Sequence, residues 1–366
     1  MKQLGNDAPL PILSAPATIN DVAQLAGVSR ATASRVLGDY GTVKAETRTM
    51  VLGAAARLGY VANVIARSMR AGTTQTLGLV IAEIGLSVFD TAMRVVIDSA
   101  RAHGYQVLVS NTNEELEAER TAIRVMLEKQ VDGLIVVPSS VTDLDFLNPK
   151  NLQGRPIVLL DRTLAPLGLT SVTGANRQGA MDAVAHFIEN GHTRIGLVVF
   201  TANIEGQTPE QPAGLISSIN DRIAGYYEAM AAVGLAVNPA WVCFAGDADV
   251  SASAAVEGIL DAADAPTALL ASNGNMSLAV LKVAKARGLL IGRDLSLVGF
   301  DDAPWASIIT PSITVVNLPI EEMARVAVEN LIGQISAAPD ARSSELPMNL
   351  VLRESVADLR TASTRK

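Results

Sequence analysis

Apolar residues follow two different patterns along this chain. Between residues 18 and 58 they recur at helical spacing in three short stretches that are separated by turns. From about residue 76, short continuous apolar runs alternate with longer amphipathic stretches. Such runs are typical of buried parallel strands that are covered by helices on both faces. The pattern therefore predicts a small helical head followed by a larger α/β body.

The head has the sequence features of three helices. The first begins at Thr18, which with Asp21 has the spacing of a capping box. Ser29 is positioned to cap a second helix over residues 30–37, and a third helix is expected over 45–58. Two short helices joined by a glycine-containing turn are typical of a helix-turn-helix, although an ordinary amphipathic hairpin with a solvated basic face shows the same spacing.

The second helix has the chemistry of a base-reading surface. Arginine can hold guanine O6 and N7 with two hydrogen bonds, and serine or threonine hydroxyls suit phosphates. Helical spacing places Ala33, Val36 and Leu37 inward and leaves the opposite side exposed. The exposed residues are Arg30, Ala31, Ser34 and Arg35.

Charge is distributed unevenly along the chain. The net charge is −8, but residues 1–72 carry eight Lys/Arg against four Asp/Glu, which leaves 21 against 33, or −12, for the rest. A basic head on an acidic body indicates a DNA-binding module joined to another domain. The single cysteine, Cys243, excludes a disulfide framework and fits a reducing cytoplasm.

The body alternates strand-like and helix-like stretches in two series, which predicts two doubly wound lobes of parallel sheet. Ligands in such folds bind at the carboxyl ends of the strands. Strands are expected at 77–82, 105–110, 133–137, 156–161, 194–200, 241–245, 268–272, 295–300, 313–318 and 350–353, and helices at 89–102, 115–129, 177–190, 221–233, 252–262, 276–287 and 320–335.

Several segments together resemble the lactose-repressor (LacI/GalR) family of transcription regulators. They are Thr18 to Leu37 (TINDVAQLAGVSRATASRVL), Val43 to Arg48 (VKAETR), Leu58 to Tyr60 (LGY) and Asn63 to Met69 (NVIARSM). The resemblance covers about residues 17–357. It implies an α/β chain with a three-helix helix-turn-helix head and a two-lobed periplasmic-binding-protein-like body.

The resemblance also implies roles for residues of the head. Arg30, Ala31 and Arg35 fall where the family reads bases in the major groove, and Ala31 offers only apolar contact, which suits thymine methyl groups. The family positions that hold phosphates or fix the docking are Thr18, Ser29, Thr32, Ser34, Thr47, Tyr60 and Asn63. Lys44 departs from the family, since it replaces a usual serine that caps the third helix, and it offers another phosphate contact.

Residues 62–75 correspond to the family's hinge helix and linker. Helices of fewer than about 12 residues are marginal alone in water, and in the family this one orders only on operator DNA. There it inserts an apolar side chain into the minor groove, which unstacks a base step. The matching residue here is Met69, with Ala66 and Arg67 beside it; the alternative is that Met69 packs only as part of a linker.

In the body, five residues match family positions that contact a small-molecule effector: Phe89, Asp161, Arg222, Asn273 and Asp301. Four of these lie at strand ends or, for Arg222, at the expected start of a helix. A guanidinium converging with carboxylates and an amide suits a hydroxyl-rich or charged metabolite. The alternative is that Arg222 and Asp301 form only interlobe or surface pairs, which contribute little to stability.

No catalytic, cofactor or metal motif is present. The sequence lacks a P-loop, a dinucleotide fingerprint and a nucleophile elbow, and its three histidines have no metal partner at ligand spacing. No secretory or membrane-spanning segment is expected, since the long uncharged stretches are interrupted by prolines.

The expected organisation is a disordered extension (1–16), a helix-turn-helix domain (17–61), the hinge and linker (62–75), an effector-binding and dimerisation domain (76–357) and a tail (358–366). We expect a cytoplasmic, homodimeric repressor that binds a palindromic double-stranded operator and responds to a sugar, sugar acid or similar metabolite. A tetramer is not expected because no apolar heptad follows Thr361, so the dimer is the default. The alternative is a small-molecule binding protein, or a degenerate regulator that acts without an effector.

Overall fold

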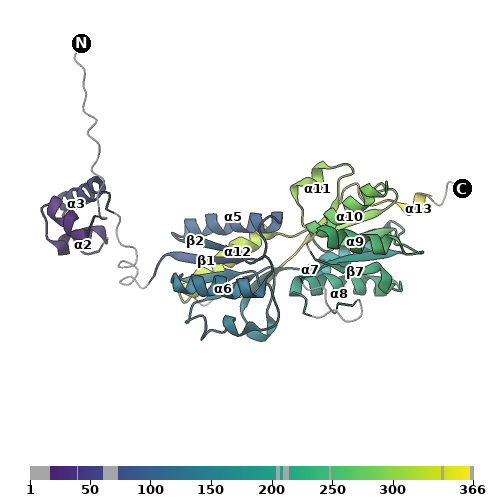
Figure 1. The fold of residues 1–366 in the computed structure, drawn as a ribbon, viewed down its shortest axis with the longest axis horizontal. Coiled ribbons are helices and arrows are strands. Elements are labelled where there is room, and N and C mark those ends of the chain that lie inside the picture. The colour runs from purple at the N-terminus through teal and green to yellow at the C-terminus, as the bar shows by residue number, and fades with distance from the viewer. Residues whose placement is uncertain are drawn as a thin grey trace, which may run out of the picture. The chain divides into compact units, whose positions relative to one another are not determined.

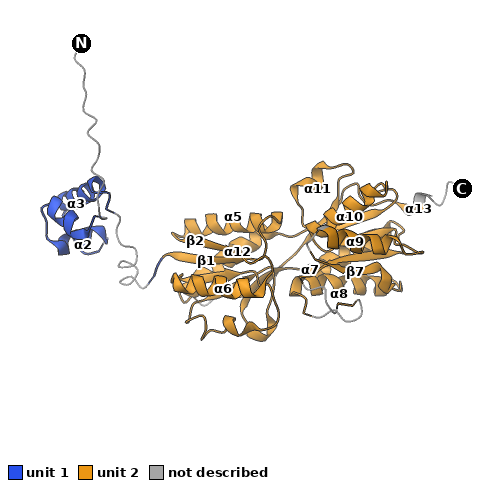
Figure 2. Ribbon diagram, viewed as in Figure 1, with its two compact units in different colours: residues 1–74 blue, residues 75–366 orange. Residues whose placement is uncertain are grey.

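The computed structural model describes residues 17–38, 40–60, 73–202, 207–208, 214–246, 249–338 and 342–362. The chain divides into two compact units, residues 1–74 and residues 75–366 (Figure 2). The proposed extension and most of the proposed hinge lie outside the described residues. No helix of the described part is both long enough and apolar enough to cross a membrane.

The first unit contains three helices, α1 (Ile19–Leu25), α2 (Arg30–Leu37) and α3 (Ala45–Arg57). The predicted capping box at the start of α1 is confirmed, since the Thr18 N–H donates to Asp21 Oδ2 over 2.8 Å and the Asp21 N–H donates back to Thr18 Oγ1. The three helices enclose a small core that includes Val22, Ala33, Val36, Val51, Ala54 and Ala55.

The second unit contains two lobes, each built on a six-stranded sheet (Figure 1). The first lobe has the strand order β11-β5-β4-β3-β1-β2, and all of its strand pairs are parallel. Helices α5 and α12 pack together on this sheet, and α6 contacts β1 and β2. Its elements are β1 (Thr76–Ile81), α5 (Ser87–Ala102), β2 (Gln106–Asn111), α6 (Leu116–Glu128), β3 (Gly133–Val136), β4 (Ile157–Leu160), β5 (Thr170–Gly174), α12 (Ile320–Ile335) and β11 (Ser344–Leu346).

The second lobe repeats this plan with the order β12-β10-β9-β8-β6-β7, in which only β12 is antiparallel to its neighbour. Helices α7 and α8 pair with each other, as do α9 and α10 (Figure 1). Its elements are α7 (Asn176–Glu189), β6 (Ile195–Phe200), α8 (Ser217–Ala232), β7 (Val242–Ala245), α9 (Asp249–Leu260), β8 (Ala268–Ala271), α10 (Gly274–Ala286), β9 (Ser296–Phe300), α11 (Pro304–Ile308), β10 (Thr314–Asn317), β12 (Asn349–Val351) and, beyond the sheet, α13 (Leu359–Ala362).

The chain passes between the lobes three times, after β5, after β10 and after β11. The first and third passages touch, because the Ala175 N–H donates to the Leu346 carbonyl. Two glycines make room there: a Cβ on Gly174 would lie 2.5 Å from Leu318, and one on Gly179 would lie 2.7 Å from Val316. Side-by-side passages of this kind are the usual place for two lobes to hinge.

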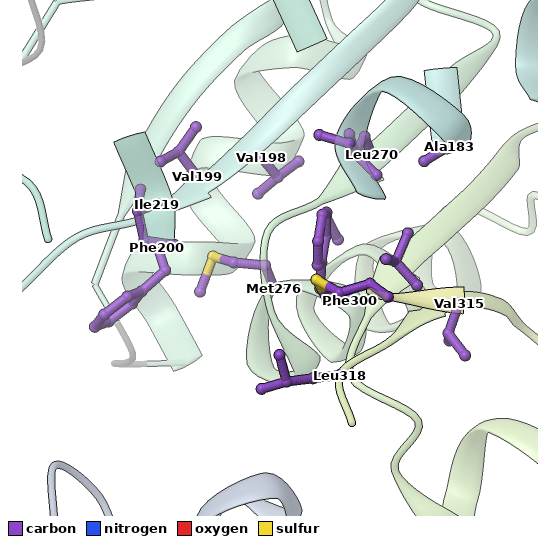
Figure 3. Packing of buried hydrophobic residues seen from close by; sticks show 14 of the residues in the cluster. Ala183, Val198, Val199, Phe200, Ile219, Leu270, Met276, Phe300, Val315 and Leu318 are labelled. Atoms are coloured by element: carbon purple, nitrogen blue, oxygen red, sulfur yellow. The ribbon is translucent and has the colours of Figure 1, made fainter. Parts of the chain in front are cut away.

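The sheets are buried on both faces, as continuous apolar runs predict. In the second lobe, side chains from β6, β8, β9 and β10 meet residues of the covering helices, among them Met276 and Ile219 (Figure 3). Phe300 ends β9 within this cluster and is fully buried. Because Phe300 is anchored in the core, it fixes the position of the residues that follow β9.

Among the described residues, the sequence analysis missed the strands β5 and β11, the short helices α11 and α13, and three short 3-10 helices at Leu144–Leu147, Ala165–Leu167 and Pro239–Trp241. One expectation was wrong in a way that matters for the site. Helix α8 begins at Ser217 rather than at 221, so Arg222 lies in its second turn instead of at its start.

Candidate operator surface and effector cleft

The base-reading face expected on α2 is exposed. Arg30, Ala31 and Arg35 are exposed, whereas Ala33 and Val36, on the opposite side of the helix, are 0% and 3% exposed. The 3.6-residue period thus separates an anchoring side from a solvent-facing side. The solvent-facing side carries two guanidinium groups, those of Arg30 and Arg35, which are five residues apart.

Side chains around α2 fix its start and its end. Ser29 Oγ accepts a 3.1 Å hydrogen bond from the Thr32 N–H and lies 2.9 Å from Thr32 Oγ1. At the other end, the Ser34 hydroxyl lies 2.8 Å from the Tyr40 hydroxyl. Ser29, Thr32 and Ser34 therefore hold the helix in shape, whatever contacts they also make with DNA.

The other predicted DNA contacts lie at the edges of the head. Lys44 occupies the N-cap position of α3 without a side-chain capping bond, and Thr47 in its first turn is half-buried. Tyr60 packs against the core of the head. Asn63, Ala66, Arg67 and Met69 lie outside the described residues.

In the second unit, all five predicted effector residues line one cleft between the lobes. Phe89 comes from α5 and Asp161 follows β4 in the first lobe. Arg222, Asn273 and Asp301 come from the second lobe. The cleft is completed by Leu86, Val88, Glu114, Arg162, Phe200, Ile216, Ser218, Ile219 and Leu318.

Asp161 and Asp301 occupy equivalent positions in the two lobes. Each follows the fourth strand of its sheet, adopts a left-handed backbone with φ of 69° and 70°, and donates its N–H to the next strand. Both are buried, and in each carboxylate Oδ1 has no hydrogen-bond partner within the described part of the chain. Buried polar atoms are rarely left unpaired, so these two oxygens mark a place that a ligand donor can fill.

Arg222 lies near the two carboxylates and donates its hydrogen bonds to neutral groups. Its Nε donates to Asn176 Oδ1 over 2.8 Å, and its Nη1 donates to the Ser272 carbonyl. The guanidinium carbon lies 4.1 Å from the centre of the Phe300 ring, which stacks beneath it. Asn273 caps α10, with its Oδ1 accepting from the Met276 N–H over 2.9 Å.

Glu114 and Arg162 are charged cleft residues that the sequence analysis missed. Arg162 Nη1 and Nη2 donate to the two oxygens of Glu114 over 2.7 and 2.5 Å, and Nη1 also donates to the Pro138 carbonyl. Arg162 directly follows Asp161 and lies over the Phe89 ring at 5.9 Å. Its position immediately after a strand end was the one sequence signal that could have revealed it.

Burial controls the ionisation of the cleft. It raises the pKa of Asp301 to about 6, against the attraction of Arg222 and a hydrogen bond from the Gly274 backbone. Burial likewise raises the pKa of Asp161, although Arg162 and Arg222 oppose the change. Desolvation lowers the pKa of Arg222, with Asp301 and Asp161 acting in the opposite direction. The two carboxylates are therefore short of positive charge and of hydrogen-bond donors.

The cleft is nearly closed in this structure. The cavity amounts to about 30 Å³, which is space for roughly one water molecule. A wider hollow of about 450 Å³ adjoins it and shares Glu114, Phe200 and Ile216. The space beside Asp161 and Asp301 is therefore smaller than a sugar in this structure, with more room in the adjoining hollow.

His192 is structural in this fold. It is buried, with Nδ1 2.8 Å from Thr267 Oγ1 and Nε2 3.1 Å from the Ala357 carbonyl, so it ties the carboxyl-terminal segment to the sheet. Within the described ranges, no three His, Cys, Asp or Glu side chains are grouped so that they could hold a metal ion.

Comparisons with known proteins match both units. Residues 18–63 match the bacterial regulatory proteins of the lacI family, and residues 184–356 match the periplasmic binding protein-like domain. The transcriptional repressor PurR of Aliivibrio salmonicida is 31% identical over 93% of this chain and 99% of its own length. The ribose operon repressor of Halalkalibacterium halodurans is 33% identical over 92% and 96%.

A solved structure extends the match to the three-dimensional fold. The lac repressor dimer bound to operator and the anti-inducer ONPF is 25% identical, covers 94% of this chain and all of its own, and superimposes with a TM-score of 0.80. Proteins of this family bind operator DNA through the head and respond to small-molecule effectors. The chain belongs to the LacI family and is a DNA-binding transcriptional regulator.

Proposed function

We propose that this regulator is a homodimeric repressor that binds a pseudo-palindromic operator and whose operator affinity is set by a small polar metabolite in the interlobe cleft. The observation that carries the effector part is the pair of buried, unpartnered carboxylate oxygens of Asp161 and Asp301, which come from opposite lobes and line one cleft. A ligand that donates to both would hold the lobes together.

Five side chains would form the effector site. Asp161 and Asp301 would accept from its hydroxyls, Asn273 would fix its orientation, and Phe89 would cover its apolar face. Arg222 would support Asp301. The three passages between the lobes then act as the hinge through which ligand binding changes the spacing of the bodies.

The head would read the operator with Arg30, Ala31 and Arg35, and the other predicted head residues would hold phosphates. The hinge with Asn63, Ala66, Arg67 and Met69 lies outside the described residues, so its insertion into the minor groove is proposed from the sequence alone. A change in the spacing of two bodies would control whether both hinges reach the operator centre.

A dimer is supported by exposed apolar side chains at one edge of the first lobe. Leu108 and Val109 on the edge strand β2, with Ile84 beside it, are 39%, 37% and 50% exposed. Exposed edge strands pair readily with another chain. Because the protein acts on DNA, we place it in the cytoplasm, associated with the nucleoid while it is bound to operator.

Thermal melting tests the effector site. A ligand that binds only the folded chain raises its Tm by mass action. We expect a member of a panel of sugars, polyols and nucleosides to raise the Tm of the unchanged chain and to have no effect on Arg222→Ala. The proposed site is wrong if Arg222→Ala responds like the unchanged chain.

A further inference from the structure

Both guanidinium groups of the cleft already donate hydrogen bonds to other groups of the protein. Three of the five N–H groups of Arg162 are used by Glu114 and by the Pro138 carbonyl, and its Nε faces the Asp161 carboxylate at 3.6 Å. Arg222 donates to Asn176 and to the Ser272 carbonyl. An anionic ligand would therefore meet one guanidinium that is paired with Glu114 and a second whose charge is offset by the nearby Asp301 and Asp161 carboxylates.

Within the described residues, two carboxylate oxygens of the cleft, Asp161 Oδ1 and Asp301 Oδ1, have no hydrogen-bond partner, and Arg162 Nε also lacks one although it faces Asp161 Oδ2 at 3.6 Å. Three carboxylates line the cleft against two guanidinium groups. Two like charges at close range repel each other, and more strongly in a buried cleft than in water. A ligand carboxylate or phosphate would meet this repulsion, whereas a hydroxyl would donate to the oxygens without it.

Glu114 is held by the fold in the position where it pairs with Arg162. Its side chain is 7% exposed, and its N–H donates to the Ala82 carbonyl. Glu114 and its neighbour Asn113 both have left-handed backbones, with φ of 60° and 51°. Glutamate rarely adopts this conformation, and such strain persists only where the surroundings impose it, often at ligand sites.

We propose that Glu114 determines the charge specificity of the cleft: by holding Arg162 with both carboxylate oxygens, it excludes anionic ligands and makes the effector a neutral, hydroxyl-rich molecule. The inference rests on the proposed effector site and narrows it. Of the two classes expected from the sequence, it favours a neutral sugar or polyol over a sugar acid.

Inorganic phosphate tests Glu114 without knowledge of the natural effector. Glu114→Gln keeps the shape of the side chain and removes its charge, which leaves the buried Arg162 without its two-pronged ion pair and with Asp161 as its nearest carboxylate. At constant ionic strength, phosphate should raise the Tm of Glu114→Gln saturably by roughly 3–6 °C and leave the unchanged chain unaffected. Glu117→Gln removes an exposed charge three residues away and should behave like the unchanged chain.

The phosphate response should disappear in the double variant Glu114→Gln/Arg162→Gln, which also removes the buried cation. Absence of a response in folded Glu114→Gln, or an equal response in the unchanged chain, would overturn the proposal. If Glu114→Gln does not fold, a neutral sugar and its anionic counterparts, such as glucose with gluconate and glucose phosphate, are titrated into the unchanged chain. Saturable binding of an acid or phosphate ester there overturns it as well, whereas a failure of ligands to alter operator affinity would count against the proposed function alone.

Discussion

Asp301 is held in the cleft at a cost to stability. Burial raises its pKa to about 6 from the usual 3.8, so the folded chain binds this proton more tightly than the unfolded chain. Its contribution to stability is full below about pH 4 and is lost as the pH rises through about 6. The fold itself does not need a charge on Asp301. A ligand that binds the carboxylate best explains why it is there.

Replacing Asp301 by Asn should therefore stabilise the chain at pH 8 and change it little at pH 4. The gain in unfolding free energy should grow between pH 4 and pH 6 and reach about 1–3 kcal/mol above that range. Chemical denaturation across this pH range measures it. Asp98→Asn, on the exposed side of α5, is the control, and equal gains at pH 4 and pH 8 would contradict the assigned ionisation.

Replacing Arg35 should show whether this residue contacts a base or only attracts DNA through its charge. If it makes a bidentate guanine contact, Arg35→Ala should weaken cognate operator binding by about 1–3 kcal/mol and affect a scrambled duplex much less. Arg57→Ala, which removes the same charge from the last turn of α3, is the matched control. Equal losses on both duplexes would make Arg35 a phosphate contact.

The sequence indicated Asp161, Asn273 and Asp301 because each follows a recognisable strand. It did not indicate the Glu114–Arg162 pair, whose members lie 48 residues apart on different loops. Which loops meet depends on the strand order β4-β3-β1-β2, and nothing in local periodicity encodes that order. Resemblance to the family supplied residue roles that spacing alone left open.

At the scale of elements, the α7–α8 pair shows how closely the second lobe is packed. A Cβ on Gly225 of α8 would lie 2.1 Å from the Arg177 carbonyl oxygen of α7, which is backbone and cannot rotate away. Gly258 of α9 is also helical, but its Cβ would meet nothing within 4 Å. The two glycines thus allow a matched comparison.

Gly225→Ala should separate α7 from α8 and lower the Tm, because overpacking costs typically 1–3 kcal/mol or more. Gly258→Ala should raise the stability by about 0.5–1 kcal/mol through helix propensity alone. Thermal unfolding followed by circular dichroism compares them. A neutral Gly225→Ala would show that the helices can move apart freely.

Long apolar runs predicted most of the strands correctly, whereas β5 and β11 were missed. β5 reads TSVTG, in which Val172 is the one large apolar residue, and β11 spans three residues. Both are strands because β4 lies beside β5 and β5 lies beside β11, which is a tertiary cause. The start of α8 was missed for a similar reason, since SSIN has little apolar periodicity of its own.

At the scale of the molecule, the basic head and the acidic body act on DNA in opposite ways. Positive charge in the head draws in DNA, whereas the body repels it, so contact with DNA is directed to the head. A two-fold dimer should then place its two copies of α2 symmetrically. Selection of duplexes from a random library should return a pseudo-palindrome, and recovery of one asymmetric half-site would contradict the dimer.

Coupling between cleft and operator is the central claim, and one titration tests it most directly. Fluorescence anisotropy measures operator affinity of the full chain with and without each member of a panel of neutral sugars and their acids. We expect a neutral sugar to change the operator Kd by about 5–150-fold in the unchanged chain, with no change in Arg222→Ala and none with the matching acid. An operator affinity that no neutral sugar changes, or that an acid changes through Arg222, would contradict the account.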